Sequence, residues 1–119
     1  MGKSGIVHEG APQSRVISLL NELIKWYETN KKNYPALILA SVVHNQFENI
    51  HPFRDGNGRV GRLLLNNILI KKGLPPVNIE LADRVEYYQT LQEYEKNKNL
   101  RPTIEFLLKE YKKTKNKLK

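Results

Sequence analysis

The sequence predicts an all-α domain of about five helices, preceded by one short β-strand. Apolar residues recur at helical spacing in successive stretches of the chain, whereas a strand-type pattern is confined to the N-terminal segment. Glycine, proline or asparagine residues interrupt the chain between these stretches. The length of 119 residues fits one small domain with one modest core. We therefore expect a single domain over 1–119, with a helical core over 14–111.

The N-terminal segment over 4–9 is typical of an extended strand. Its β-branched residues are followed by Gly10, and glycine commonly bounds a strand. A lone strand cannot pair its own backbone groups, so its partner must be a loop, a ligand, another chain or sequence outside this one. The strand begins with Ser4, Gly5, Ile6 and Val7.

The first two predicted helices differ in the width of their apolar faces. From Ser14 to Tyr27, apolar residues recur three and four apart and give one broad stripe. Polar residues over 30–33 end this helix. The second helix has Pro35 in its first turn, where a missing N–H is tolerated, and it runs to Phe47. Because this second helix is apolar nearly all round, we expect it to be the central, buried one.

Three further helices follow an irregular segment over 49–58. The third begins near Asn57 and ends before Gly73, which suits a left-handed C-terminal cap. Tyrosine residues at helical spacing mark the fourth helix, and Pro102 opens the fifth. The lysines near the C-terminus are expected to form a solvated, frayed basic tail over 112–119.

Composition excludes several classes of protein. No apolar run approaches the ~20 residues of a membrane span, and no N-terminal stretch is typical of a signal peptide. The absence of cysteine excludes disulfides and thiolate metal sites. We therefore expect no membrane partner and a cytoplasmic location, with delivery to another cell as an effector left open. The net charge of +8 favours anionic partners, but much of it lies in the lysine-rich end, so nucleic acid is not expected as a partner.

The segment over 51–62 gathers residue types that suit a polyphosphate. A glycine-rich turn over 55–58 leads directly into a helix, whose first N–H groups lack internal partners and attract anions. Arg59 and Arg62 lie three residues apart, so they project from one face of that helix. Two guanidinium groups beside such a turn suit a polyphosphate better than a single carboxylate.

Two more residues of this segment point to group transfer. Asp55 would repel a phosphate unless a cation lay between them, and magnesium bridging the phosphate oxygens resolves that conflict. Histidine titrates near neutral pH, so His51 suits proton transfer. Together these parts are those of phosphoryl or nucleotidyl transfer. The alternative is a plain turn made by Gly56 and Gly58, in which Asp55 or Asn57 caps the helix.

The segment over 51–62 resembles the signature of the Fic family, H-P-F-x-D/E-G-N-G-R-x-x-R, at every fixed position. The resemblance covers most of residues 4–111 and implies an enzyme that transfers AMP from ATP to a Ser, Thr or Tyr hydroxyl of a target protein. ATP as substrate and Mg²⁺ are implied with it. Outside the signature, the resemblance rests on 36–40, His44, Phe47, 73–76, Tyr87, Tyr88 and 104–106.

The resemblance also implies a role for each residue of the signature. His51 would be the general base, Asp55 would bind Mg²⁺, and Phe53 would anchor the loop in the core. Asn57 would also steady the α-phosphate. The strand formed by Ser4, Gly5, Ile6 and Val7 would match the flap, which aligns the target segment as an added β-strand beside the nucleotide. The phosphates would be held by Gly56, Asn57, Gly58, Arg59 and Arg62.

Three positions outside the signature are less specific. Tyr87 matches a tyrosine that lies near the adenosine in this family, with core packing as an equal alternative. His44 is expected to pack in the core or on a helix face rather than to bind a metal. Glu95 stands where relatives often carry Asn, so no nucleotide contact is expected from it.

Departures from the family pattern leave the regulation and the chemistry open. The inhibitory motif S/T-x-x-x-E-G/N has no match, so inhibition is expected from a missing helix or from a partner protein. The first half of the flap hairpin and the usual N-terminal helices are absent, as in an N-terminally truncated fragment or a minimal family member. Gly58 favours AMP transfer over phosphotransfer, because the phosphotransferase branch carries Lys there. The alternatives are UMP or phosphocholine transfer, phosphoryl transfer, removal of AMP, or an inactive basic binding module.

Overall fold

The computed structural model describes residues 10–117 and contains five α-helices. No β-strand occurs within this described range, so the all-α class and the number of helices are confirmed. The strand expected over 4–9 lies outside the described residues. The helices are α1 (Val16–Asn30), α2 (Ala36–Ile50), α3 (Asn57–Lys71), α4 (Arg84–Asn97) and α5 (Arg101–Lys117), with short 3₁₀ turns at Gln13–Arg15 and Leu81–Asp83.

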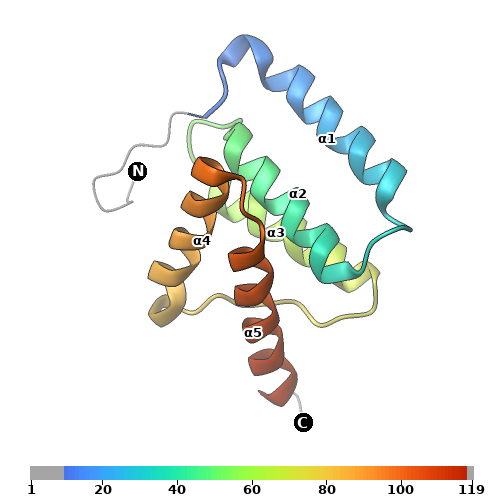
Figure 1. Cartoon of the computed structure of the whole chain (residues 1–119), viewed down its shortest axis with the longest axis vertical. Helices are drawn as coiled ribbons and strands as arrows, with labels where there is room; N and C mark the ends of the chain where they lie inside the picture. The colour runs from blue at the N-terminus through green and yellow to red at the C-terminus, as the bar shows by residue number, and fades with distance from the viewer. Residues whose placement is uncertain (1–9, 118–119) are drawn as a thin grey trace.

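The central helix is α2, as its apolar sequence predicts. It packs against the other four helices, and most extensively against α3. Figure 1 shows α2 and α3 side by side through the middle of the molecule, with α1 along one side and α4 and α5 on the other. Within residues 10–117, no helix combines the length and the apolar character needed to cross a bilayer. The core consists of Leu39, Ala40, Val43, Leu65, Ile68, Leu69, Val77, Ile79, Tyr87, Phe106 and Leu107.

Two helix starts differ from the prediction by a residue or two. The chain turns through Gln13–Arg15 before α1 begins, so Ser14 belongs to a 3₁₀ turn rather than to the helix. Pro35 is the N-cap of α2, with an extended ψ of 156°, and not a residue of its first turn. Either position suits proline, because neither requires its missing N–H.

The C-terminal part of α5 is more ordered than the sequence predicts. Residues 112–117, expected to be a frayed tail, continue the helix as far as Lys117. One of the lysines is tied to the start of α4: Lys113 Nζ lies 2.7 Å from Asp83 Oδ2 and 3.5 Å from Glu110 Oε2. The contact with Asp83, a residue far from Lys113 in the sequence, explains the difference, because no local sequence pattern predicts it.

The connection from α3 to α4 is held by one asparagine. Gly73, with φ of 84°, ends α3 in the left-handed region, as predicted. Asn66 then donates from Nδ2 to the Val77 carbonyl at 3.1 Å and accepts from the Val77 N–H at 2.7 Å. These two bonds fix the irregular chain while Val77 and Ile79 enter the core.

α2 and α3 approach each other closely at Gly61. A methyl group placed on Gly61 would collide with Glu48 Oε2 and lie 3.3 Å from His44 Cε1. The three residues are buried, so this contact is part of the interior rather than of the surface. The missing side chain at Gly61 therefore allows the two helices to lie together.

We expect Gly61→Ala to destabilise the protein, although alanine favours helix by about 1 kcal/mol over glycine. Overpacking against Glu48 and His44 should outweigh that gain and lower the free energy of unfolding by about 1–2 kcal/mol. Urea denaturation measures the difference. Asn67→Ala, on the exposed face of the same helix, is the control and should stay within about 0.5 kcal/mol of the wild type. A stabilised Gly61→Ala variant would contradict the close contact.

Candidate active site

The signature segment lies in the loop between α2 and α3, and a left-handed residue stands at each end of that loop. His51, the C-cap of α2, has φ of 51° and ψ of 59°, and its N–H bonds to the Phe47 carbonyl at 3.0 Å. Gly56, the N-cap of α3, has φ of 80°. Glycine adopts this conformation readily, whereas a histidine held there is strained by roughly 1–3 kcal/mol. Strain of this kind is often found at functional sites.

The chain that follows the predicted flap packs against His51. Gly10 has φ of 70°, and a methyl group placed on it would lie 2.7 Å from His51 Cβ. The next residue, Ala11, donates its N–H to the Ile50 carbonyl at 3.1 Å. The described part of the chain therefore begins, at Gly10, beside the candidate base. Ser4, Gly5, Ile6 and Val7 themselves lie outside the described residues.

The shape of the loop is set by Asn57, whose side chain is almost fully buried. Its Nδ2 donates to the Phe53 carbonyl at 2.7 Å, and its Oδ1 accepts from the Phe53 N–H at 2.9 Å. Both ends of the amide are therefore used within the loop. The bond to the Phe53 carbonyl uses one of the two Nδ2 hydrogens, so the second hydrogen and the backbone N–H of Asn57 are the donors left for a phosphate. This structural role of the side chain was not anticipated from the sequence.

The ring of Phe53 is only partly covered. Its centroid lies 6.2 Å from that of Phe47 at an interplanar angle of 55°, and 48% of Phe53 is exposed. The hydrogen bonds to Asn57 act on the backbone of Phe53 rather than on its ring. Anchoring of this loop in the described structure is therefore shared between a backbone clamp and a limited ring contact.

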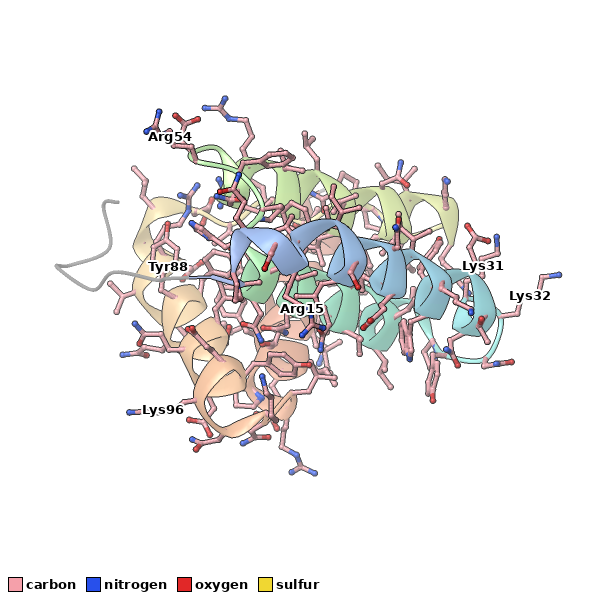
Figure 2. The ribbon with its side chains drawn as sticks, turned by 90° about the horizontal axis from the view of Figure 1, so that it is seen from above. Arg15, Lys31, Lys32, Arg54, Tyr88 and Lys96 are labelled. Atoms are coloured by element: carbon pink, nitrogen blue, oxygen red, sulfur yellow. The ribbon has the colours of Figure 1, made fainter. Side chains whose placement is uncertain are left out.

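The first turn of α3 has the features of an anion site. Its N-cap, Gly56, provides no side-chain hydrogen bond to the first N–H groups, and the turn contains no acidic residue. Arg62 is half-buried, and its Nη1 lies 3.0 Å from the point that a Cβ on Gly58 would occupy. Arg59 is exposed. Figure 2 shows Arg54 extending outward from the loop, away from the helix bundle.

A magnesium ion at this site would depend on Asp55, which is exposed in the loop. Within residues 10–117, no group of three or more side chains of the metal-binding types could hold an ion by themselves. This arrangement fits Mg²⁺, which commonly binds through one or two carboxylates together with substrate phosphates and water.

Behind the anion site, His44 is buried and hydrogen-bonded at both ring nitrogens. Nδ1 lies 3.0 Å from the Gly61 carbonyl oxygen, and Nε2 lies 2.7 Å from the Tyr87 hydroxyl. Burial lowers the pKa of His44 to about 4, against an opposing effect of the bond to Gly61. The expectation that His44 packs in the core is confirmed.

The two neighbouring tyrosines on α4 differ in exposure. Tyr87 is 1% exposed, and burial raises its pKa above the ordinary value. It is a core residue and has no surface for an adenosine. Tyr88 is partly exposed, with its ring centroid 5.2 Å from that of Tyr87. Figure 2 shows Tyr88 at the same end of the molecule as Arg54. The two tyrosines differ in burial, and two adjacent identical residues in the sequence do not indicate which of them is buried.

Comparison with known proteins identifies the kind of domain. The model of the Fic/DOC family matches residues 2–69. A probable protein adenylyltransferase from Aquifex aeolicus is 40% identical over 98 residues, which are 78% of this chain and 30% of that protein. The protein adenylyltransferase Fic of Nematostella vectensis is 46% identical over 68 residues, covering 57% of this chain and 16% of that protein. The chain thus spans less than a third of the length of these relatives.

Solved structures share the fold. A variant of Fic-1 from C. elegans superimposes with a TM-score of 0.85 at 30% identity, covering 92% of this chain and 33% of that one. The BepC protein of Bartonella tribocorum, solved with bound AMPPNP, has a TM-score of 0.71 at 21% identity and covers 88% of this chain and 52% of its own. At that lower identity the likeness concerns the fold alone.

We expect Asn57→Ala to loosen the loop, because it leaves the Phe53 N–H and carbonyl without their partner. Losing both bonds should lower the free energy of unfolding by about 1–3 kcal/mol. Hydrogen exchange should show faster exchange of the Phe53 amide, while Asn67→Ala should leave that amide unchanged. An equally protected Phe53 amide in Asn57→Ala would contradict the clamp.

The buried imidazole predicts how stability depends on pH. His44 titrates near pH 4 in the folded protein and near 6.5 when unfolded, so between these values only the unfolded chain binds the proton. Stability should be greatest above pH 6.5 and fall by up to about 1.4 kcal/mol per pH unit toward pH 4. Urea denaturation at several pH values should show a flatter dependence in His44→Gln. An NMR titration of His44 centred near pH 6.5 would contradict this.

Proposed function

The chain belongs to the Fic/DOC family, and from that premise we propose that it transfers the AMP part of ATP to a hydroxyl group of a target protein. The observation that carries the proposal is the loop over 51–56. It begins with a histidine in a left-handed cap, contains an exposed carboxylate, and leads directly into a helix start that has no side-chain cap and carries two arginines in its first turns. We propose further that residues 1–119 form a single domain of this family.

In the proposed reaction, His51 is the general base. The hydroxyl oxygen of the target forms a bond to the α-phosphorus of ATP, the bond from that phosphorus to the bridging oxygen breaks, and pyrophosphate leaves. The hydroxyl proton passes to the imidazole of His51. The left-handed cap fixes the backbone of His51 at the end of α2, so less reorganisation is needed before the transfer.

The phosphates of ATP are assigned to the start of α3. The N–H groups of Asn57, Gly58 and the following residue form the positive end of α3, and Arg59 and Arg62 supply further positive charge. Asp55 would hold Mg²⁺, which neutralises phosphate charge when it is bound. ATP is chosen as the nucleotide because relatives are named adenylyltransferases and because BepC, with the same fold, was solved with AMPPNP.

Target and adenosine are assigned to the two sides of this phosphate site. We propose that a target segment adds a β-strand along the flap formed by Ser4–Val7. The contacts of Gly10 and Ala11 with His51 and Ile50 support this, because they hold the residues that follow this segment in sequence against the loop. On the other side, Tyr88 replaces Tyr87 as the proposed neighbour of the adenosine, since only Tyr88 has exposed surface.

The proposal predicts that the chain, with Mg²⁺ and ATP labelled on the α-phosphate, labels a protein in a bacterial lysate. His51→Asn should reduce the rate at which label is transferred to protein by at least about 100-fold, the contribution typical of a general base. Asparagine is chosen because it tolerates positive φ better than alanine does. Gel autoradiography measures the product.

The matched control is Lys98→Asn, because Lys98 is the other non-glycine residue with positive φ, at 56°, within the described residues. It ends α4 and is exposed, so its label should equal that of the wild type. Label that arises only from ATP labelled on the γ-phosphate would indicate phosphoryl transfer instead. An unlabelled lysate with the wild-type chain would overturn the proposal.

A further inference from the structure

Two neighbouring residues of the chain before α1, Gly10 and Ala11, lie against the end of α2. The Ala11 N–H donates to the Ile50 carbonyl at 3.1 Å. Carbonyl groups in the last turn of a helix lack partners within it, so this bond supplies one from outside α2. The 3₁₀ turn that leads into α1 begins at Gln13, two residues further on. Gly10 and Ala11 are therefore joined to α2 by a hydrogen bond and to α1 by a short turn.

The contact of Gly10 with His51 leaves no room for a side chain. A methyl group placed on Gly10 would lie 2.7 Å from His51 Cβ, 3.1 Å from the Ile50 carbonyl oxygen and 3.5 Å from His51 Cγ. The Cβ atom is bonded to the backbone, so it cannot turn aside as the end of a long side chain can. Any residue larger than glycine must therefore displace the backbone of His51 or move away from it, and in either case the contact is lost.

His51 needs such a contact because of its backbone conformation. Its φ of 51° and ψ of 59° lie in the left-handed region, which residues other than glycine seldom adopt. A strained conformation of this kind persists only where the surrounding structure holds it. The N–H of His51 is bonded to the Phe47 carbonyl of α2, and its Cβ lies against Gly10.

We propose that Gly10 is a positioning residue for the general base, because its lack of a side chain lets the chain before α1 hold His51 in place for the transfer of AMP. The proposal rests on the proposed function, in which His51 takes the proton of the target hydroxyl. It assigns Gly10 to the transfer step and not to ATP binding. Gly10 contacts the end of α2, whereas the phosphates are assigned to the start of α3.

The chain contains a matched glycine for comparison. Gly73 has φ of 84°, close to the 70° of Gly10, but a methyl group placed on it would have no neighbour within 4 Å among the described residues other than those next to it in the chain. Gly73→Ala therefore introduces the same kind of backbone strain without a collision, beyond the opposite end of α3.

Gly10→Asn is the converse variant, because asparagine tolerates positive φ but still carries a Cβ atom. Strain alone predicts that Gly10→Asn recovers the activity lost in Gly10→Ala. A collision with His51 predicts that it does not.

The first test measures the initial rate at which the full chain, with Mg²⁺ and ATP labelled on the α-phosphate, labels protein in a bacterial lysate. At saturating ATP, the rate should fall about 10- to 100-fold in Gly10→Ala and Gly10→Asn, because displacing a reacting group by about 1 Å can cost about 100-fold. Gly73→Ala should label at the wild-type rate. The dissociation constant of Mg²⁺–ATP, measured by calorimetry, should be unchanged in all three variants.

Three results would overturn the positioning role. They are equal rates in Gly10→Ala and Gly73→Ala, a wild-type rate in Gly10→Asn, or a loss of ATP affinity in the Gly10 variants as large as their loss of rate. In each case a wild-type chain that labels the lysate leaves the proposed function standing. A wild-type chain that labels nothing would remove both.

A second measurement needs neither nucleotide nor target, so it separates an effect on His51 from an effect on target binding. The ¹³Cα chemical shift of His51, which depends on φ and ψ, should change in Gly10→Ala and Gly10→Asn but not in Gly73→Ala. In the wild type, the Ala11 amide should exchange slowly with water because of its bond to the Ile50 carbonyl. A wild-type Ala11 amide that exchanges as fast as an unbonded one, or a His51 signal that is the same in all four proteins, would overturn the proposal.

Discussion

The contact between α2 and α3 at Gly61 is the constraint on which the rest of the structure depends. Because Gly61 has no side chain, Glu48 and His44 of α2 come against α3, and His44 reaches the Gly61 carbonyl. The pairing brings the end of α2 next to the start of α3, so a short loop is enough to connect them. The contact of α2 with α3 at Gly61 therefore determines the position of the loop that carries the signature.

The loop itself holds conformations that an isolated peptide would not keep. A left-handed His51 is supported by Gly10 on one side and by the end of α2 on the other, and Asn57 fixes the backbone of Phe53. Each support comes from a different part of the chain. Electrostatic catalysis requires donors and charges that are held in place in advance, and in the proposed function these supports would meet that requirement.

The helices and the position of the loop could be predicted from the sequence, whereas most of the side-chain contacts that hold them in place could not. Helical periodicity, Gly73 and the glycine-rich turn are local signals, and they predicted the five helices and the position of the loop. The hydrogen bonds of Asn57 to Phe53 are also local. They could not be predicted, because an asparagine before glycine is equally compatible with a role as a ligand or as a helix cap. The bonds of His44 to Tyr87 and of Lys113 to Asp83 join segments far apart in the chain, which periodicity does not describe.

The clamp at Asn57 has a chemical consequence for how the protein ages. Asparagine followed by glycine is prone to deamidation, since the next backbone nitrogen can attack the side-chain carbonyl and close a succinimide ring; asparagine is accordingly among the heat-labile residues. In the folded chain, Asn57 and Gly58 are held in a helix with the amide engaged on Phe53, so ring closure is blocked. Each excursion to the unfolded state removes that protection. Hydrolysis of the ring would replace the amide by a carboxylate, which cannot donate a hydrogen bond to the Phe53 carbonyl. The change is covalent, so it would persist after the chain refolds.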